Sequence, residues 1–443
     1  MFQRFNGCAW KFGLFSVGLL SCQISLANHF LSQDRQWIFG DWNGQRQALE
    51  SKGYKFNASI VSEAATNLNG GYNDEQAVRN AGQLTLGANF DFNKIAGWKD
   101  TTAALTVTKR KGDALTVARI KDPRTSTLGN SQEIVGRGEI WRLSQAWIKT
   151  GFADNTVQFK IGRMGASEDF NGSHCEFQSL LLCGGQLGKS MGSVWFNGPV
   201  SVWAANVKYQ FLPEWTVGLG VYEINLDNVK TKSDRDGFNL DMNNVDGVLI
   251  PMELAWKPKL AMFNHLPGEY KFGAVYSTAE ANDIVSNQVR DSKHSFWVNA
   301  QQQLTQHDQD AKRGLFVSVN GVVNDKATSA VSSTQQVAFW YKGPFESRPH
   351  DSVGLGFANY SVNERLTDRQ RQLNESLGYE EYDAIAADYT PIQHDELNIE
   401  LNYTYQWSPA ISLRPNLQYI YQPSGVKEVD DALVAGLTLK LNF

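Results

Sequence analysis

The chain has 443 residues, a formal net charge of −5 and a hydrophobic content of 42%. This mildly acidic balance offers no basic surface, so no nucleic-acid partner is expected. Beyond the N-terminus no run of about 18 apolar residues occurs, which excludes a transmembrane helix but not a β-barrel, whose two faces average out as polar.

The N-terminus predicts an export signal. Arg4 and Lys11 give it a positive start, Phe12 to Leu20 is apolar, and Ser25-Leu26-Ala27 fits a small-x-small cleavage site. We therefore expect residues 1–27 to be a cleaved signal peptide.

Four cysteines fall into two pairs. Cys8 and Cys22 leave with the signal, although Leu19-Leu20-Ser21-Cys22 loosely resembles a lipoprotein box, which would acylate Cys22. The mature chain keeps Cys175 and Cys183, and in an exported chain such a pair most simply closes a disulfide. A metal site that includes His174 is the alternative, but these three residues are too few for a closed zinc shell.

An N-terminal segment, residues 28–55, precedes the strands. Within it Gln45 to Lys52 predicts a short helix that ends at Gly53. From there the hydrophobic period changes to two, and residues 56–443 are expected to form one β-domain.

Alternation of apolar and polar residues predicts strands along most of this domain, consistent with 38 glycines and only 12 prolines. In Leu397 to Trp407 the odd positions are apolar or aromatic and the even positions are polar. The final strand, Leu433 to Phe443, repeats the pattern and ends on an aromatic residue. Such strands present one face to lipid and one to water.

About 16 such segments occur, with centres near residues 60, 88, 105, 144, 159, 206, 219, 252, 273, 299, 318, 338, 356, 402, 416 and 438. Short connections alternate imperfectly with long ones, the long ones being residues 111–131, 164–195, 225–246 and 361–394. The expected fold class is an all-β, transmembrane antiparallel barrel of about 16 strands with a short N-terminal helix. A secreted, water-soluble β-protein is the alternative, but its strands would seldom end on phenylalanine at the last residue.

This architecture implies partners. The apolar faces would contact outer-membrane lipid, and the strand ending in Phe443 resembles the signal that barrel-assembly machinery recognises. Porin-like barrels often trimerise, so a homo-trimer is one expected assembly, and any lipid-facing strand could supply its interface.

The sequence lacks recognisable catalytic motifs. None of its seven histidines lies in a paired metal-ligand spacing, and the nucleophile, phosphate-binding and paired-cysteine motifs are missing. We expect no enzyme activity, no metal and no cofactor. A barrel enzyme or a surface adhesin is the alternative of another class.

A pore explains more, because a barrel of this size leaves an aqueous lumen whose selectivity comes from the residues that narrow it. Sugars are neutral polyols, and arginine can bond adjacent hydroxyls through its planar fork. A neighbouring carboxylate accepts hydroxyl protons and orients the arginine. The stretch Gln132 to Gln145, with Glu133, Arg137, Glu139 and Arg142, and Arg110 upstream supply such groups.

Several motifs support this interpretation. They are Phe39-Gly40-Asp41-Trp42-x-Gly44, Gly82-Gln83-Leu84-Thr85-Leu86-Gly87, Gln132-Glu133-x-x-Gly136-Arg137-Gly138, Trp141-Arg142-Leu143, Gly162-Arg163-Met164, Asp169-Phe170-Asn171, Cys175-x-Phe177-Gln178-x-Leu180-x-Leu182-Cys183-Gly184 and Gly268-Glu269-Tyr270-Lys271. Together they resemble the OprB-type carbohydrate-selective porins of Gram-negative outer membranes. The resemblance runs from the mature N-terminus to about residue 280 and includes the terminal strand.

The resemblance implies a channel constriction lined by arginines and a glutamate, which fall here on Arg110, Glu133 and Arg137. Strand parity supports Arg110 independently, because Ala103, Leu105 and Val107 set the apolar face and leave Arg110 on the lumen side. The alternative for Arg110 is an interfacial cation at a strand end.

Parity and resemblance disagree about the second arginine. If Trp141, Leu143 and Trp147 face lipid, Arg142 points into the lumen and Arg137 points outward. Gly136 and Gly138 could accommodate a bulge or loop that resets the phase in favour of Arg137. Both arginines therefore remain candidates.

The sequence thus predicts an outer-membrane porin for facilitated diffusion of small carbohydrates, monosaccharides such as glucose or related polyols. A general diffusion porin, or a channel for sugar acids or cyclic polyol acids, is the alternative.

Overall fold

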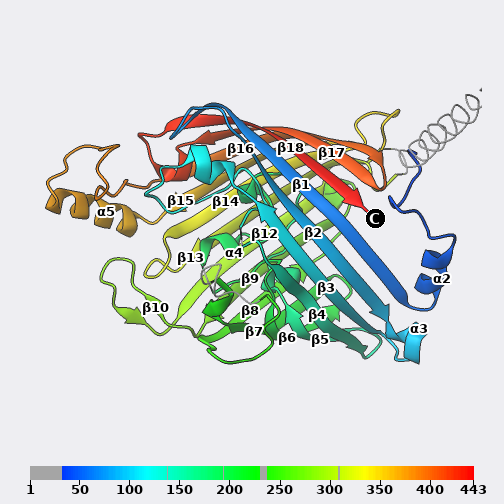
Figure 1. Ribbon diagram of the computed structural model, residues 1–443. Coiled ribbons are helices and arrows are strands. Elements are labelled where there is room, and N and C mark those ends of the chain that lie inside the picture. The colour runs from blue at the N-terminus through cyan, green and yellow to red at the C-terminus, as the bar shows by residue number, and fades with distance from the viewer. Residues whose placement is uncertain (1–31, 137, 193, 230–236, 308–309) are drawn as a thin grey trace, which may run out of the picture.

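The structure is a computed structural model that describes residues 32–443 except 137, 193, 230–236 and 308–309. Within these residues the chain forms a closed barrel of 16 strands, each antiparallel to its neighbours (Figure 1). The first and last barrel strands pair from Ser59↔Asn442 to Gly71↔Asp430 and close it. The predicted fold class is confirmed, whereas the expected signal peptide, residues 1–27, lies outside the described residues.

The barrel strands are β1 Tyr54–Gly71, β2 Val78–Asp91, β3 Thr101–Gly112, β4 Trp141–Phe152, β5 Val157–Met164, β6 Val202–Leu212, β7 Trp215–Ile224, β8 Gly247–Trp256, β9 Gly268–Ser277, β12 Lys293–Gln303, β13 Gly314–Asn324, β14 Val331–Lys342, β15 Ser352–Val362, β16 Glu396–Ser408, β17 Ile411–Tyr421 and β18 Asp430–Asn442. A separate hairpin pairs β10 Ala281–Asn282 with β11 Val289–Arg290.

Three of the described α-helices lie beyond the ends of the barrel, namely α2 Gln45–Ser51, α3 Phe92–Ala96 and α5 Glu364–Ser376, whereas α4 Leu187–Ser190 lies within its outline. None of the described helices has the length and apolar content needed to cross a membrane. Helix α2 matches the predicted N-terminal helix. Helix α5 lies within the long connection predicted at 361–394, and Asn363 caps it by accepting a hydrogen bond from Arg365 N at 3.1 Å.

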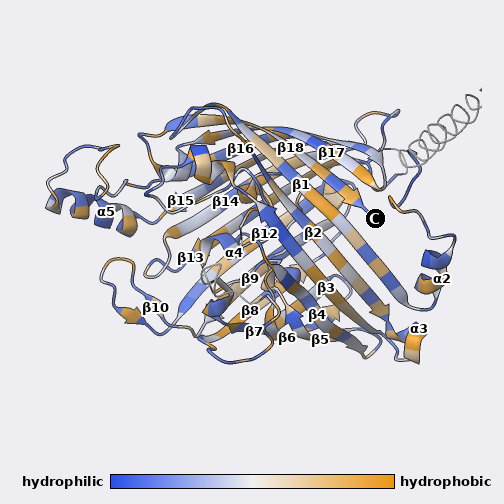
Figure 2. Cartoon of the chain, viewed as in Figure 1, coloured by the Kyte–Doolittle hydropathy of each residue, from blue (hydrophilic) through white to orange (hydrophobic). Residues whose placement is uncertain are grey.

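The barrel is apolar outside and polar inside. On β16 Leu401 is 52% exposed on the outer face, whereas its neighbours Glu400 and Asn402 are buried in the lumen. Leu417 on β17 is likewise exposed between buried Asn416 and Gln418. Figure 2 shows this alternation as orange and blue bands along β1, β2 and β3. The pattern follows from the two-residue period of a strand, which directs successive side chains to opposite faces of the wall.

The two ends of the barrel differ. Short connections at residues 153–156, 213–214 and 409–410 gather at one end with α2, α3 and the C-terminus, which we call the turn end (Figure 1). Long connections, including those that carry α5 and β10, gather at the opposite end, which we call the loop end. In outer-membrane barrels the turn end faces the periplasm and the loop end faces the outside.

Strand β4 contains a bulge that the sequence pattern did not reveal. Thr106 pairs with Gln145 and Val107 pairs with Leu143, so Ser144 is the extra residue. The bulge moves Trp147 to the inner face, where Lys160 Nζ lies 4.4 Å from its ring centroid. The expectation that Trp147 faces lipid in phase with Trp141 is therefore wrong.

A charge on the outer face should be costly. We expect Leu417→Arg, near the middle of β17, to lower the free energy of unfolding by about 2–4 kcal/mol, because the guanidinium would enter the lipid midplane. Urea unfolding in phospholipid vesicles, followed by tryptophan fluorescence, measures this. The control is Leu373→Arg on α5, since Leu373 is 45% exposed, as Leu417 is 43% exposed, but lies beyond the wall. Equal effects of the two changes would contradict the assignment of the outer face.

Candidate channel constriction

The connection between β5 and β6, residues 165–201, folds back inside the barrel, and we call it the crossing loop. Asn171 N donates to Glu253 Oε2 on β8 at 2.8 Å, and Leu182 O accepts from Gln336 Nε2 on β14 at 2.6 Å. Figure 1 shows α4 of this loop within the outline of the barrel. The loop therefore spans the lumen between walls that are far apart in sequence.

Apolar side chains of the crossing loop fill the lumen along two walls. Trp195 and Leu187 are fully buried in a cluster with Tyr222 and Trp297 of the barrel. A second cluster joins Leu181, Leu182 and Phe177 to residues of β14 and β15. Each such side chain stabilises the folded loop by about 1.5–3 kcal/mol. Space for solute therefore remains on the opposite side, along β2, β3 and β4.

Glu400 on β16 anchors the tip of the crossing loop. Its carboxylate is fully buried and accepts hydrogen bonds from Gln178 N at 3.0 Å and Ser179 N at 2.7 Å. The Gln178 side chain donates to Ala64 O and accepts from Asn416 Nδ2, which ties the tip to β1 and β17. These contacts fix the tip of the crossing loop against β1, β16 and β17.

The tip also carries the predicted disulfide. Cys175 and Cys183 are bonded, with their Cα atoms 4.6 Å apart. Lys189, which follows on α4, donates hydrogen bonds to the carbonyl oxygens of Leu180 and Cys183. These contacts hold the ammonium group at the edge of the loop that faces β3.

A second piece of chain enters the lumen from the β3–β4 connection, and we call residues 127–135 the inner segment. Gln132 Nε2 donates to Glu63 O at 2.7 Å, and Ile134 N donates to Glu63 Oε2 at 3.1 Å. Asn130 O accepts from Leu180 N of the crossing loop at 2.8 Å. The inner segment is thus fixed to β1 and to the crossing loop, with Glu133 between its two tethers.

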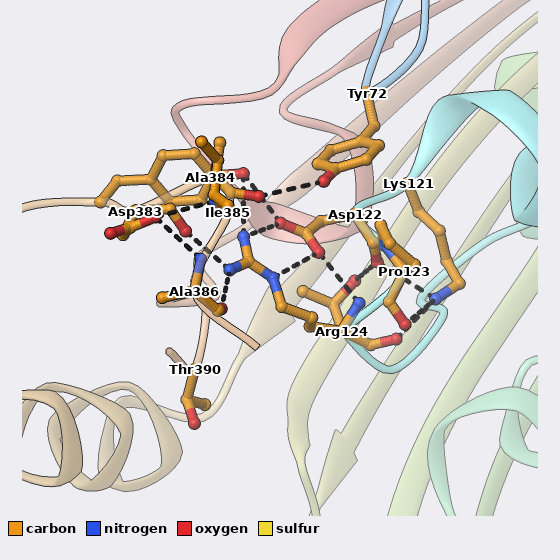
Figure 3. Close-up of polar contacts among 12 residues, drawn as sticks. Tyr72, Lys121, Asp122, Pro123, Arg124, Asp383, Ala384, Ile385, Ala386 and Thr390 are labelled. Atoms are coloured by element: carbon orange, nitrogen blue, oxygen red, sulfur yellow. Dashed lines mark hydrogen bonds and ion pairs between the residues drawn. The ribbon is translucent and has the colours of Figure 1, made fainter. Parts of the chain in front are cut away.

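The inner segment follows directly on a cluster of polar contacts at the loop end, among Asp122, Arg124 and residues 382–386, which we call the clamp (Figure 3). Arg124 pairs with buried Asp122 at 2.7 Å and donates to the carbonyl oxygens of Asp383 and Ala386 at 2.6 and 2.8 Å. Burial would raise the pKa of Asp122, but hydrogen bonds from Arg124 and Tyr382 lower it below its usual range. The clamp therefore joins the β3–β4 and β15–β16 connections through an ionised pair.

Wall, inner segment and crossing loop enclose a cavity of about 540 Å³. Two cations, Arg110 and Lys189, and two carboxylates, Glu133 and Glu168, line it together with uncharged polar side chains. Those uncharged groups are Gln83, Thr85, Thr106, Thr108, Thr127, Asn130, Ser144, Gln145, Ser167 and Asn197. The cavity is therefore lined by charges of both signs and by uncharged hydrogen-bond donors and acceptors, which come from three separate parts of the chain.

Arg110 is held at the β3 wall of this cavity. Its Nε donates to Gln83 Oε1 at 2.8 Å and its Nη1 donates to Val135 O at 3.4 Å. Within the described residues Nη2 has no hydrogen-bond partner. The carboxylates of Glu133 and Glu63 exert the main attraction on its charge. The guanidinium is thus oriented by the wall and keeps donor capacity for a solute.

The other predicted site residues are placed differently. Glu133 lines the cavity from a loop, so strand parity does not apply to it. Arg142 lies opposite Thr108 on the inner side of β4 and is 4% exposed, beside the cavity and not among its lining residues. Arg137 lies outside the described residues. Gly136 and Gly138 flank it with left-handed φ angles of 94° and 78°, so they belong to a loop and not to a strand bulge.

Sequence reasoning missed Lys189 and Glu168. Both lie on the crossing loop, whose inward path depends on distant partners such as Glu253 and Glu400. No local period marks such a path. The only available signal was the adjacent cysteine motif, which indicated an ordered loop.

The chain is similar to known porins. A family model described as carbohydrate-selective porin, OprB family, matches residues 75–443. "Putative porin QuiX" of Acinetobacter baylyi is 72% identical over 98% of this chain and 99% of its own length, and Porin B of Pseudomonas aeruginosa is 44% identical over 99% and 98%. The high-pH structure of Pseudomonas putida OprB has a TM-score of 0.90 and 43% identity, and the match covers 93% of this chain and 100% of that one.

Loss of the Glu400 anchor should loosen the constriction. We expect Glu400→Ala to give a larger single-channel current with larger fluctuations. The buried N–H groups of Gln178 and Ser179 would each lose an acceptor at a cost of about 1–3 kcal/mol, which would loosen the tip of the crossing loop. Planar-bilayer recording measures this. The matched control is Glu396→Ala, which removes a buried glutamate of the same strand that holds Ser424 N instead. A steady, wild-type current in Glu400→Ala would refute the anchoring role.

The charge of Lys189 should make ion selectivity depend on pH. Burial lowers the pKa of Lys189 to about 7, against the opposing attraction of Glu133. The ammonium is therefore charged below this pH and neutral above it, so anion preference should fall between about pH 6 and pH 8. Reversal potentials across a potassium chloride gradient measure this. Lys189→Met should abolish the pH step, and a step that persists would assign it to another group.

Proposed function

Because the chain belongs to the OprB family of carbohydrate-selective porins, we propose that it admits small carbohydrates, monosaccharides such as glucose or related polyols, through an arginine- and glutamate-lined constriction. The family and the barrel indicate a channel and not an enzyme, in the outer membrane of a Gram-negative bacterium. Movement through it is facilitated diffusion down a concentration gradient.

One observation carries the proposal: Arg110 and Glu133 face the same cavity with opposite charge. A sugar presents adjacent hydroxyls that both donate and accept. The guanidinium donates hydrogen bonds to the hydroxyl oxygens, and the carboxylate accepts hydrogen bonds from the hydroxyl groups. A ring of residues with one sign of charge would select ions, whereas this pair of opposite charges can bind a neutral polyol.

The remaining cavity groups suit the same class of solute. Threonine, serine and amide side chains of β2, β3 and β4 can form neutral hydrogen bonds with a solute, and these bonds replace its bonds to water one after another. Because each bond is modest in net free energy, the solute is held weakly and leaves readily.

Arg137 and Arg142 belong to the proposed set in different roles. Arg137 follows Glu133 in the sequence of the same connection and is included as a further cation of the proposed set. Arg142 lies opposite Thr108 and supports the wall from the inner side of β4. Passage from the outside to the periplasm then runs from the loop end through the constriction to the turn end.

Further partners follow from the outer surface. The apolar outer face contacts outer-membrane lipid, and the terminal strand with Phe443 serves recognition by the barrel-assembly machinery. A homo-trimer is the assembly we propose to test, because related barrels of this size commonly trimerise.

Two other functions give different conductance behaviour. A general diffusion porin would show a current that glucose leaves unchanged, whereas a selective channel shows saturable block as glucose is titrated. A barrel enzyme or adhesin would show no current.

Arg110→Ala tests the constriction. We expect a larger conductance and a half-blocking glucose concentration raised about tenfold or more, because a charged hydrogen bond contributes about 1.5–3 kcal/mol. The control is Lys109→Ala, which removes the neighbouring cation of β3, one that lies over the Trp141 ring. The proposal fails if the two variants bind glucose equally well.

A further inference from the structure

A second cavity, of about 360 Å³, lies inside the barrel at the turn end, and we call it the turn-end recess. Its floor is formed by β14 to β18, and Glu176 of the crossing loop covers it. The lining residues are Glu176, Lys342, His350, Ser352, Thr404, Gln406, Pro409, Ser412, Arg414, Lys440 and Asn442. The recess therefore lies beyond the constriction on the side toward the periplasm.

The recess faces the lumen. Arg414 pairs in register with Thr438, whose hydroxyl donates to Gln178 of the crossing loop at 3.0 Å. Thr438 is thus an inward residue, and Arg414 shares its face. Lys440, two residues further along β18, lies on that face as well because side chains alternate along a strand.

Arg414 and Lys440 form a pair of like charges. Lys440 pairs with Ser412, so Arg414 and Lys440 are diagonal neighbours on adjacent strands, within reach of long side chains. Arg414 Nε donates to Thr404 Oγ1 at 2.9 Å. Within the described residues neither its two terminal nitrogens nor Lys440 Nζ has a hydrogen-bonding or ion-pair partner. The charge of buried Glu400 attracts Arg414, but no ion pair joins these two side chains in the described part of the chain, so both cations keep donors for an anion.

The carboxylate in the recess is already engaged. Glu176 pairs with Lys342 at 3.1 Å and with His174 at 3.0 Å. Burial would raise the pKa of Glu176, but His174 and Lys342 lower it to about 2. Glu176 therefore neutralises Lys342, and among the described residues no carboxylate forms an ion pair with Arg414 or Lys440.

The rest of the lining suits a hydroxylated molecule. Ser352, Thr404 and Ser412 contribute hydroxyls, and Gln406 and Asn442 contribute amides. These groups can donate to and accept from a polyol, while the planar fork of Arg414 can take a carboxylate through two parallel bonds.

We propose that the turn-end recess is a second solute subsite, which binds the carboxylate of a small hydroxylated monocarboxylic acid through Arg414 and Lys440. The subsite rests on the proposed channel function and specifies a further class of solute for it. A neutral sugar that leaves the constriction passes the recess, whereas a sugar acid is retained there briefly. Binding stays weak because the recess is open to water.

Block of the channel by a sugar acid and by its neutral counterpart tests the subsite. In planar bilayers we compare potassium gluconate with glucose on wild type, on the double variant Arg414→Gln and Lys440→Gln, and on Lys94→Gln. Lys94 is a matched control because it lies on α3 at the same end, outside the recess. We expect the double variant to raise the half-blocking gluconate concentration about tenfold or more, since charged hydrogen bonds are lost, and to leave glucose block and Lys94→Gln unchanged.

The outcomes separate the two claims. An unchanged gluconate block in the double variant, or an equal loss of gluconate and glucose block, overturns the subsite. A change in chloride selectivity without any change in gluconate block also overturns it, because the recess would then attract ions without binding a sugar acid. Glucose that fails to block wild type, with gluconate block intact, refutes the proposed sugar constriction and leaves the subsite supported.

Discussion

The buried carboxylate of Glu400 is the contact on which the pore depends. It accepts backbone hydrogen bonds from Gln178 and Ser179 and so holds the tip of the crossing loop inside the barrel. With the tip fixed, Leu180 N can meet Asn130 O, which positions the inner segment that carries Glu133. A barrel of this size would otherwise enclose a wide aqueous lumen. The constriction is therefore made by a loop that the wall binds, and not by the wall alone.

The polar interior that makes this arrangement stable also supplies its chemistry. Where the crossing loop and the inner segment touch the wall, lumen-facing side chains form hydrogen bonds with their backbone N–H and C=O groups. Where these two connections leave space, lumen-facing side chains line the path of the solute. Along β2, β3 and β4 that space is lined by charges of both signs. At the turn end Arg414 and Lys440 give the lumen a positive recess. One barrel thus presents two different environments in sequence along the path of a solute.

Strands were predictable from sequence because their two-residue period is local, and every predicted centre from 60 to 438 lies within or close to a barrel strand. The disulfide between Cys175 and Cys183 was predictable because the N-terminus indicates export and because these are the two cysteines left after the expected signal peptide is removed. The Ser144 bulge was not, since a single inserted residue leaves composition unchanged while reversing the face of Trp147. Parity placed Arg110 on the inner face, and Arg110 lines the cavity, but Lys189 and Glu168 depend on long-range contacts of the crossing loop. Such contacts leave no periodic trace in the chain.

The most direct test of the central claim is a crystal structure of the protein soaked with glucose at saturating concentration. We expect a sugar in the cavity between the β3 wall and the crossing loop, with hydroxyl oxygens within hydrogen-bond distance of the Arg110 guanidinium and of the Glu133 carboxylate. A sugar that binds elsewhere in the lumen and leaves this cavity to water would contradict it.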